Sequence, residues 1–463
     1  MKKILLKTLA GPVLLAVILS SCGEDRSGEY YALISSKSWM YETMQQYYLF
    51  YEDLPNEKEL DFFATPSSFL TSVASDKDKK NGYIFSHVDS VANSRSDVSE
   101  YPCFGFEGAL VRTFSGDYAI RVIYTEKDSP AEKAGLKRGD WIIAADNKPI
   151  TSNDYETYIK APAQSYTFTL GNYTEEGFDT ISTPVVMPQP EYVKIDNLLK
   201  YTTISSGNRK AAYLLYNSFG ENDTQELQQA VAQLATEHPD DIILDLRYNP
   251  GGYVNTAAVL ASLLAPPEAL GKTFIDLLYN DKRNEKTTFL LDAAYRTGGA
   301  SFSYNNLYII TSSETASASE AVINGLKPYM QGKLFQVGNA TYGKNVGQEL
   351  FNSEEAPQLN FWLTTFYLTN SEGFYDYFDN GLSADYKIEE DYSGELGELG
   401  SNTDALLKPV LVHMETGAFP AIETPAQQTT KSLQNKYHTT VVYNSIAAKS
   451  KKLKKIKLSL IHI

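Results

Sequence analysis

A serine-rich turn is the first stretch of this sequence whose residue types could do covalent chemistry. Residues 313–320, "SETASASE", follow the strand-like run "NLYIITS" and precede the helix-like run "AVINGL". A serine at such a turn acts as a nucleophile when a neighbouring base accepts its proton. It can also be a plain helix cap, because Ser317 and Glu320 fit the S-x-x-E capping box. The rest of the sequence has to distinguish these two roles.

A candidate base and a glycine turn would complete the chemistry. "GNATYGKNVGQ" places Lys344 four residues before Gln348. A lysine accepts a proton only when it is neutral, so its site must lower the pKa by roughly three units from about 10.4, which apolar burial can do. Gln348 returns to the same face in a strand or a helix, so it can bond Lys344 without adding charge. Glycines in the turn "NPGG", residues 249–252, let backbone approach a bound ligand closely.

The elements around these stretches predict a mostly parallel α/β sheet. Strand-like runs precede both turns, helical patterns follow them, and residues 223–238 read as an amphipathic helix. Alternation of this kind builds a parallel sheet that helices cover. Both turns then lie at the carboxyl edge of the sheet, where open α/β folds bind ligands. Residues 267–305 are expected to be a long loop.

The chain upstream of this sheet has the pattern of a small β/α domain. "YAIRVIYT" and "WIIAAD" read as strands, and Pro130 opens a short helix that Gly135 closes. The stretch "SPAEKAGLKRGDWIIAADNKPI" resembles a PDZ domain, and "CFGFEG" resembles the carboxylate-binding loop of that family. The resemblance implies that a peptide C-terminus adds here as an extra strand, with Phe104, Gly105 and Phe106 in the key places. The alternative is that the glycines of this loop only make a turn.

Three motifs in order, "DLRYNPGG", "TASASE" and "ATYGKNVGQ", behind this PDZ-like domain resemble the tail-specific, or C-terminal-processing, serine peptidases. The resemblance covers roughly residues 100–390. It implies an α/β fold with an N-terminal helical segment, a small PDZ-like β/α domain and a mostly parallel, crotonase-like peptidase core.

The same resemblance implies a role for each site residue. Ser317 matches the nucleophile, Lys344 the general base and Gln348 the residue that orients the base. The oxyanion hole matches the backbone of Gly251 or Gly252 together with the N–H of Ala318.

Several alternatives stay open at this point. Ser319 is the nearest rival nucleophile, and His87 in "YIFSHVDS" is the main rival base, since some relatives use a histidine from an N-terminal segment. The first function to consider is a serine endopeptidase that cleaves extracytoplasmic proteins with a Ser-Lys dyad. The second is a lipoprotein of the same fold that binds peptides or apolar ligands without cleaving them. The third is a peptidase that uses His87 against one secreted peptide.

Composition excludes other classes of function. The net charge of −16 argues against nucleic acid as a partner, because phosphate binding needs a basic surface. The five histidines and two cysteines have no metal-site spacing, so we expect neither a metal nor a cofactor. Protein or peptide substrates remain as partners, and the sequence makes no prediction of oligomeric state.

The N-terminus predicts export and a lipid anchor. "MKKILLKTLAGPVLLAVILSSC" has a basic start, a short apolar core and small residues before Cys22, which is typical of a secretory signal. "LSSC" resembles a bacterial lipobox, so Cys22 would be lipidated and would tether the chain to a membrane outside the cytoplasm, in the periplasm or on the outer surface. The alternative is an ordinary signal peptide cleaved near Ser21.

These patterns divide the chain into five parts. The last part ends in a lysine-rich run whose final six residues, "LSLIHI", can be translated from a transposon-end sequencing adapter, so we expect this end not to be native. The expected parts are a lipoprotein signal peptide (1–22), an N-terminal helical region (23–98), the PDZ-like domain (99–188), the peptidase core (189–420) and an unstructured basic tail (421–463).

Overall fold

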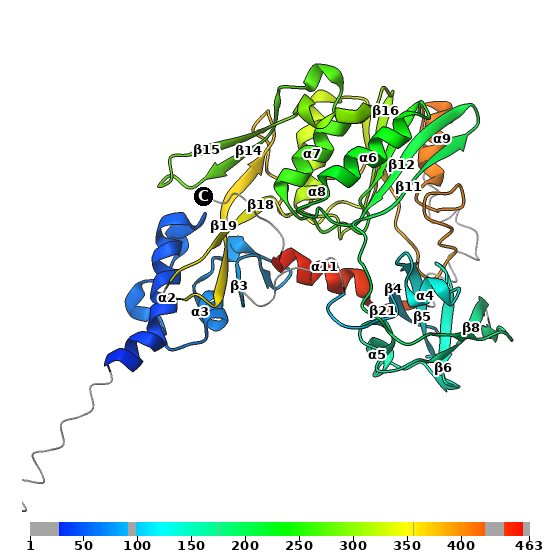
Figure 1. Cartoon of the computed structure of the whole chain (residues 1–463), viewed down its shortest axis with the longest axis horizontal. Coiled ribbons are helices and arrows are strands. Elements are labelled where there is room, and N and C mark those ends of the chain that lie inside the picture. The colour runs from blue at the N-terminus through cyan, green and yellow to red at the C-terminus, as the bar shows by residue number, and fades with distance from the viewer. Residues whose placement is uncertain (1–26, 91–98, 175, 355, 422–438, 457–463) are drawn as a thin grey trace, which may run out of the picture.

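A computed structural model describes residues 27–90, 99–174, 176–354, 356–421 and 439–456. It shows an N-terminal helical region, a small β/α domain and a larger α/β core with two sheets (Figure 1). The α/β fold class and the helical N-terminal region predicted from the sequence are confirmed. The predicted signal peptide and Cys22 lie outside the described residues. Within these ranges, none of the helices combines the length and apolar composition that a membrane span requires.

The first core sheet has six strands in the order β11-β12-β13-β16-β17-β20. β12 through β20 pair in parallel, and β11 pairs with β12 in the antiparallel sense. Parallel neighbours need crossover connections, and α6, α7 and α8 provide them. The strands are β11 (Leu198–Ser206), β12 (Arg209–Tyr216), β13 (Asp241–Asp245), β16 (Asn306–Thr311), β17 (Leu334–Gly338) and β20 (Tyr386–Lys387), and the helices are α6 (Thr224–Ala235), α7 (Val254–Leu264) and α8 (Ala318–Leu326).

This sheet is covered on both faces. Leu214, Ile242 and Leu244 belong to one buried cluster with the apolar sides of α6, α7 and α8. Alternate residues of the same strands, such as Tyr213 and Ile243, belong to a second cluster with α9 (Lys408–Thr416) and with the small β/α domain. All five residues of β13 are therefore buried, as expected for a strand inside a parallel sheet.

A second core sheet is antiparallel and was not predicted. Its order is β15-β14-β19-β18, and β3 adds to β19. The prediction of a long loop at 267–305 is wrong, because this segment contains the β14–β15 hairpin. The charged stretch "NDKRNE" between the two strands and the glycines near residue 298 made the whole segment read as loop, although it contains strand-forming residues on either side of the turn. The strands are β14 (Thr273–Tyr279), β15 (Lys286–Leu290), β18 (Val346–Phe351) and β19 (Leu359–Thr369).

The N-terminal region packs against this second sheet rather than standing apart from it. Met40 and Tyr48, at and beyond α2, share a buried cluster with Phe85 and with Phe361 and Leu363 of β19. Its elements are α2 (Ser27–Tyr47), η1 (Tyr51–Asp53), η2 (Glu57–Glu59), α3 (Pro66–Val73), η3 (Asp76–Asp78), β1 (Lys79–Lys80), β2 (Tyr83–Ile84) and β3 (His87–Ser90).

The small β/α domain is a separate sheet in the order β10-β8-β6-β5-β4-β21. The strands predicted at 118–125 and 141–146 are confirmed as β5 and β6. Its elements are β4 (Phe106–Arg112), β5 (Tyr118–Thr125), α4 (Pro130–Lys133), β6 (Trp141–Ala145), β7 (Lys148–Pro149), α5 (Tyr155–Ile159), β8 (Thr167–Thr174), β9 (Gly177–Thr180) and β10 (Val185–Val186).

The prediction of an unstructured tail is wrong for its described part. Thr440–Asn444 forms β21, which pairs with β4, and Ser445–Ile456 forms α11. α11 contacts both β4 of the small domain and β2 of the N-terminal region, and Figure 1 shows it below the core between these two parts. No pattern in the tail marked this strand and helix, because the strand is short and its partner lies more than 300 residues earlier in the chain.

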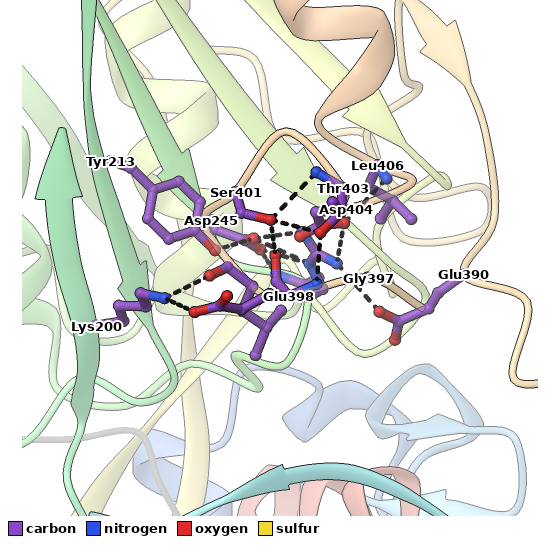
Figure 2. Close-up of polar contacts among 12 residues, drawn as sticks. Lys200, Tyr213, Asp245, Glu390, Gly397, Glu398, Ser401, Thr403, Asp404 and Leu406 are labelled. Carbon is purple, nitrogen blue, oxygen red and sulfur yellow. Dashed lines mark hydrogen bonds and ion pairs between the residues drawn. The ribbon is translucent and has the colours of Figure 1, made fainter. Parts of the chain in front are cut away.

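A buried cluster of charges joins the small domain to the core. Arg247, fully buried after β13, donates to both oxygens of Asp245 and of Asp404 and to Glu390. Figure 2 shows these three carboxylates with their neighbours. Arg138 of the small domain also pairs with Glu390. Burial alone would raise the pKa of Glu390, but the guanidinium groups of Arg138 and Arg247 lower it to about 2.

Candidate active site

Ser317 occupies the turn between β16 and α8 in a strained backbone conformation. Its φ is 63° and its ψ is −115°, a region that residues other than glycine rarely adopt and that costs on the order of 1–3 kcal/mol. Gly251 of the neighbouring turn approaches Ser317 closely, since a Cβ at position 251 would lie 2.8 Å from the Ser317 Cβ. Strain of this kind at a strand-to-helix turn holds the nucleophile of α/β-hydrolases.

The Ser317 hydroxyl is buried without a hydrogen bond. Its Oγ atom has no partner among the described residues, although the residue is fully buried. Buried polar atoms nearly always find partners, so an unsatisfied one calls for an explanation. Ser317 is the N-cap residue of α8 and forms a capping box with Glu320, whose carboxylate accepts from the Ser317 N–H. The hydroxyl faces the Glu320 N–H in that box without a hydrogen bond of full geometry, so capping leaves its proton and lone pairs open to chemistry.

Glu320 ties this turn to the segment that carries Lys344. Its buried carboxylate accepts from the backbone N–H of Ser317 at 2.6 Å, of Gly343 at 2.6 Å and of Lys344 at 2.8 Å, and from the Thr341 hydroxyl at 2.6 Å. Burial raises the pKa of Glu320, and these hydrogen bonds oppose that shift. The sequence suggested Glu320 only as a capping residue. Its main structural role is to hold the Ser317 turn and the segment of Lys344 together.

Lys344 and Gln348 meet as the spacing predicted. Both side chains are buried, and Lys344 Nζ donates to Gln348 Oε1 at 3.1 Å. The same Nζ lies 5.0 Å from the centre of the Phe85 ring. Gln348 is in β18 and Lys344 precedes that strand, so four residues of extended chain bring both to one side.

The glycine turn lies beside Ser317, also as predicted. β13 and β16 are parallel neighbours, so the turns that follow them meet at the same sheet edge. The Gly251 N–H donates to Asn249 Oδ1 at 2.8 Å, so it is already engaged. Among the described residues, no hydrogen bond is found from the N–H of Gly252 or of Ala318. These two donors are the better candidates for an oxyanion hole.

The two rival residues have other surroundings. The Ser319 hydroxyl donates to the Asn249 carbonyl at 3.1 Å inside the first turn of α8. The His87 ring stacks on Trp362 at 5.9 Å between centroids, and its Nδ1 is 3.1 Å from the Phe85 carbonyl. Both side chains therefore have structural roles in the contacts described.

The predicted peptide-binding loop lies in the small domain, away from these residues in sequence and sheet. Phe104 and Phe106 are buried in its core, and Gly105 has a φ of 73° with Ser129 too close for a Cβ. Beyond the loop, β4 is an edge that β21 covers in the antiparallel sense, and the Tyr443 ring lies 4.8 Å from that of Tyr155 in α5.

Sequence reasoning missed two residues behind Gln348. Gln348 Nε2 donates to Thr364 Oγ1 at 3.1 Å, and Thr364 Oγ1 donates to Asp78 Oδ1 at 2.6 Å. Thr364 stands in an apolar strand and Asp78 in a charged stretch, so neither pattern marked them. No cluster of three or more metal-ligating side chains exists within the described ranges.

Comparisons with known proteins identify the family. The model described as "Peptidase family S41" matches residues 210–388, "Peptidase S41 N-terminal domain" matches 35–87 and "PDZ domain" matches 121–167. The two S41 models together match half of the chain. The chain belongs to peptidase family S41, and its small β/α domain is a PDZ domain.

Individual relatives agree with this assignment. The carboxyl-terminal-processing protease of Synechocystis sp. is 26% identical over 232 residues, covering 48% of this chain and 49% of that protein. The chloroplastic carboxyl-terminal-processing peptidase 3 of Arabidopsis thaliana is 25% identical over 239 residues, covering 50% of this chain and 44% of that protein. The chain thus spans about half the length of these relatives.

A solved structure supports the arrangement of most of the chain. A protein from Bacteroides fragilis assigned to the S41 proteases has a TM-score of 0.73 to this structure at 28% identity. The match covers 82% of this chain and 97% of that one. The N-terminal region, PDZ domain and core are therefore shared with a member of the same family.

Proposed function

We propose that this protein is a serine endopeptidase in which Ser317 is the nucleophile and Lys344 the general base. The observation that supports it most is the Ser317 hydroxyl, which is buried without a hydrogen bond on a strained turn. Glu320 holds the backbone of Lys344 to that same turn. Membership of family S41 agrees with this chemistry.

The residues present suffice for acyl transfer. Ser317 Oγ attacks the scissile carbonyl carbon while the neutral Lys344 amine takes the hydroxyl proton. The N–H groups of Ala318 and Gly252 bind the oxyanion at the N-terminus of α8. The Lys344 ammonium then protonates the leaving amine and becomes neutral again. The neutral Lys344 amine next takes a proton from a water molecule, which hydrolyses the acyl-enzyme and releases Ser317. Burial of Lys344 disfavours the ammonium form and so supplies the neutral base.

The test is cleavage of an unfolded protein by the purified chain and by its Ser317→Ala variant, with fragments read by mass spectrometry. Ser313 is exposed in the same turn, so Ser313→Ala is the matched control. We expect cleavage by the parent and the control only. Equal cleavage by Ser317→Ala would contradict the assignment and direct attention to Ser319. A non-catalytic binder of peptides or apolar ligands is the alternative, and binding without cleavage by the parent would favour it.

We propose further that the PDZ domain recognises peptide C-termini as an added strand on β4. The place is the edge that β21 covers, and β21 runs antiparallel to β4 toward the loop at Gly105. An external peptide would therefore compete with this segment of the chain itself. Lys449 of α11 pairs with Glu107 at 3.2 Å, and the Ser445 hydroxyl accepts from the Gly108 N–H at 2.9 Å, so α11 holds β21 in place.

A labelled peptide with the sequence of residues 439–444 and a free C-terminus tests this competition. We expect it to bind a chain ending at residue 438 and to bind the full chain far more weakly, as measured by fluorescence anisotropy. Tyr443→Ala in the full chain, which removes the ring contact to α5, should strengthen binding of the added peptide. Equal binding by the full and shortened chains would contradict competition.

The lipid anchor at Cys22 and an extracytoplasmic location are also proposals. They rest on the signal-like N-terminus and its lipobox-like end. Expression of the full chain and of Cys22→Ala in a bacterium, followed by separation of membranes, tests them. Membrane association that is lost in the variant would support the anchor, and association that persists would contradict it.

A further inference from the structure

A chain of four buried side chains runs from Lys344 into the N-terminal region. It passes from Lys344 to Gln348, from Gln348 to Thr364 at 3.1 Å and from Thr364 to Asp78 at 2.6 Å. Gln348, Thr364 and Asp78 are all fully or almost fully buried. Asp78 follows α3, 286 residues before Thr364 in the chain, and thus comes from a different part of the fold.

The protons in this series of hydrogen bonds can point in one direction only, from Gln348 through Thr364 to Asp78. Asp78 receives hydrogen bonds from the Tyr48 hydroxyl at 3.1 Å and from the Ser86 N–H at 3.4 Å on Oδ2, and from Thr364 on Oδ1. A threonine hydroxyl has one proton, and here it is given to Asp78. Thr364 Oγ1 can then only accept from the Gln348 amide, so the NH₂ group of Gln348 must face Thr364.

That direction fixes which atom of Gln348 faces the lysine. With its NH₂ group turned to Thr364, the amide presents Oε1 to Lys344 and accepts one ammonium or amine proton. A flipped amide would donate a proton to the neutral amine and occupy the lone pair that has to receive the Ser317 proton. The acceptor at the far end of the chain therefore decides whether Lys344 can work as a base.

We propose that Asp78 and Thr364 are positioning residues of the active site, which keep Gln348 in the orientation that leaves the lone pair of Lys344 available. This inference rests on the proposed Ser-Lys function and adds to it a contribution from the N-terminal region. Burial raises the pKa of Asp78 to about 6, opposed by the hydrogen bonds from Ser86, Thr364 and Tyr48, so the carboxylate form predominates at neutral pH.

Asp78→Asn should reverse the direction of donation along these hydrogen bonds. The position of Oδ2 faces two donors, Tyr48 and Ser86, so the new amide places its oxygen there and its NH₂ group toward Thr364. Thr364 must then give its own proton to Gln348, whose amide flips to accept it. The side chains keep almost the same size, so the effect is on proton direction and not on packing.

Thr364→Val interrupts the chain, and the neighbouring residue provides a matched control. Thr365 is equally buried in β19, and its hydroxyl has no hydrogen bond among the described residues. Thr365→Val therefore makes the same chemical change one residue away without touching the chain. Thr364→Ser restores the hydroxyl and is the conservative rescue.

The experiment measures kcat and KM for all four variants of the full chain, beside Ser317→Ala. We expect Thr364→Val and Asp78→Asn to lower kcat by about 10- to 100-fold, a part of the 10²–10⁴ that general base catalysis contributes, with KM little changed. Thr364→Ser and Thr365→Val should stay close to the parent. Parental kcat in Thr364→Val, while Ser317→Ala is inactive, would overturn the positioning role and leave the proposed function intact.

A second measurement works even when no peptide is cleaved. The side-chain NH₂ resonances of Gln348, identified by their loss in Gln348→Met, report its hydrogen bond to Thr364. Thr364→Val should shift them and speed their exchange with water, whereas Thr365→Val should not. Unchanged resonances in Thr364→Val would show that Gln348 does not donate to Thr364, and this would overturn the positioning role whatever the outcome for catalysis.

Discussion

Arg247 and Lys344 are both buried basic residues of the core, and their surroundings differ. Arg247 is held by the carboxylates of Asp245, Asp404 and Glu390, which form the cluster in Figure 2. The contacts described for Lys344 Nζ are with an amide oxygen and an aromatic ring. Carboxylates keep a buried cation charged, whereas an amide leaves a lysine free to lose its proton. The first arrangement serves structure and the second suits chemistry.

The largest effect on turnover should come from replacing Lys344. Lys344→Met keeps the length of the side chain and removes the base, so we expect turnover to fall by up to about 10⁴-fold. The free energy of unfolding should stay the same or rise, because no buried amine then has to be desolvated. Steady-state kinetics and urea unfolding check the two parts. A marked loss of stability would show that Lys344 is structural like Arg247.

Arg247→Met should give the opposite pattern. It leaves the buried carboxylates of Asp245 and Asp404 without their cation, while Glu390 keeps Arg138, and breaking a buried pair costs about 3–5 kcal/mol. Urea unfolding at pH 7 measures the loss. Arg209→Met is a control, since Arg209 pairs with Asp241 at the edge of the same sheet and is itself partly exposed. Arg209→Met should lower the free energy of unfolding by less than Arg247→Met. An equal loss would contradict the view that the Arg247 cluster depends more strongly on its cation.

Asp78, at the end of the hydrogen-bond chain from Lys344, and Glu390, beside Arg247, should respond to pH in opposite directions. Asp78 has a raised pKa of about 6, so its contribution to stability is full below about pH 4 and is lost as pH rises through 6. Glu390 has a lowered pKa of about 2, so its contribution is full above about pH 4.5 and is lost as pH falls toward 2.

Unfolding free energies of the parent, Asp78→Asn and Glu390→Gln between pH 3 and 8 test this contrast. Over this range Asp78 should account for a change of about 3 kcal/mol and Glu390 for about 2 kcal/mol, from about 1.4 kcal/mol per pKa unit, because the Glu390 shift is sampled only between about pH 4.5 and 3. Relative to Asp78→Asn, the parent should lose stability between pH 4 and 7. Relative to Glu390→Gln, it should lose stability as the pH is lowered. Slopes of the same sign would contradict the comparison.

The smallest effect should come from making the lysine site resemble the arginine site. Gln348→Glu puts a carboxylate beside Lys344 Nζ and favours the ammonium form. The acid limb of the kcat/KM profile should move up by about one pH unit, so activity at neutral pH falls by about tenfold and partly returns at pH 9. Gln348→Met is the neutral control and should not move the limb. An unmoved limb in Gln348→Glu would argue against Lys344 as the base.

Sequence reasoning found what lies in continuous stretches. The motifs around Ser317, Lys344 and Gly251 each combine a strand end with small or polar residues, so their spacing predicted the turn, the adjacent strands and the Lys344–Gln348 contact. Thr364 could not be told from Thr365 in "FWLTTFYLT", because only the fold decides which face meets Gln348. Asp78 likewise has no signature among the charges of "SDKDKK".

The other errors also came from long-range pairing. β21 was missed since its partner strand is formed by residues near 110. The second core sheet consists of two local hairpins, β14–β15 and β18–β19, which are joined only by the pairing of β14 with β19, and β3 joins it from the N-terminal region. Pattern reasoning sees residues that are close in sequence, and pairing between such distant segments leaves no local mark.

The contact between Asp78 and Thr364 also has a consequence for timing. During synthesis, residue 78 emerges long before residue 364, and β3 has to wait for β19 before it can pair. We therefore expect a growing chain to have no working base, even after the turn at Ser317 has been made. A peptidase assembled in this order gains its base only after the N-terminal region has packed against β19, so the earlier segments are already folded when cleavage becomes possible.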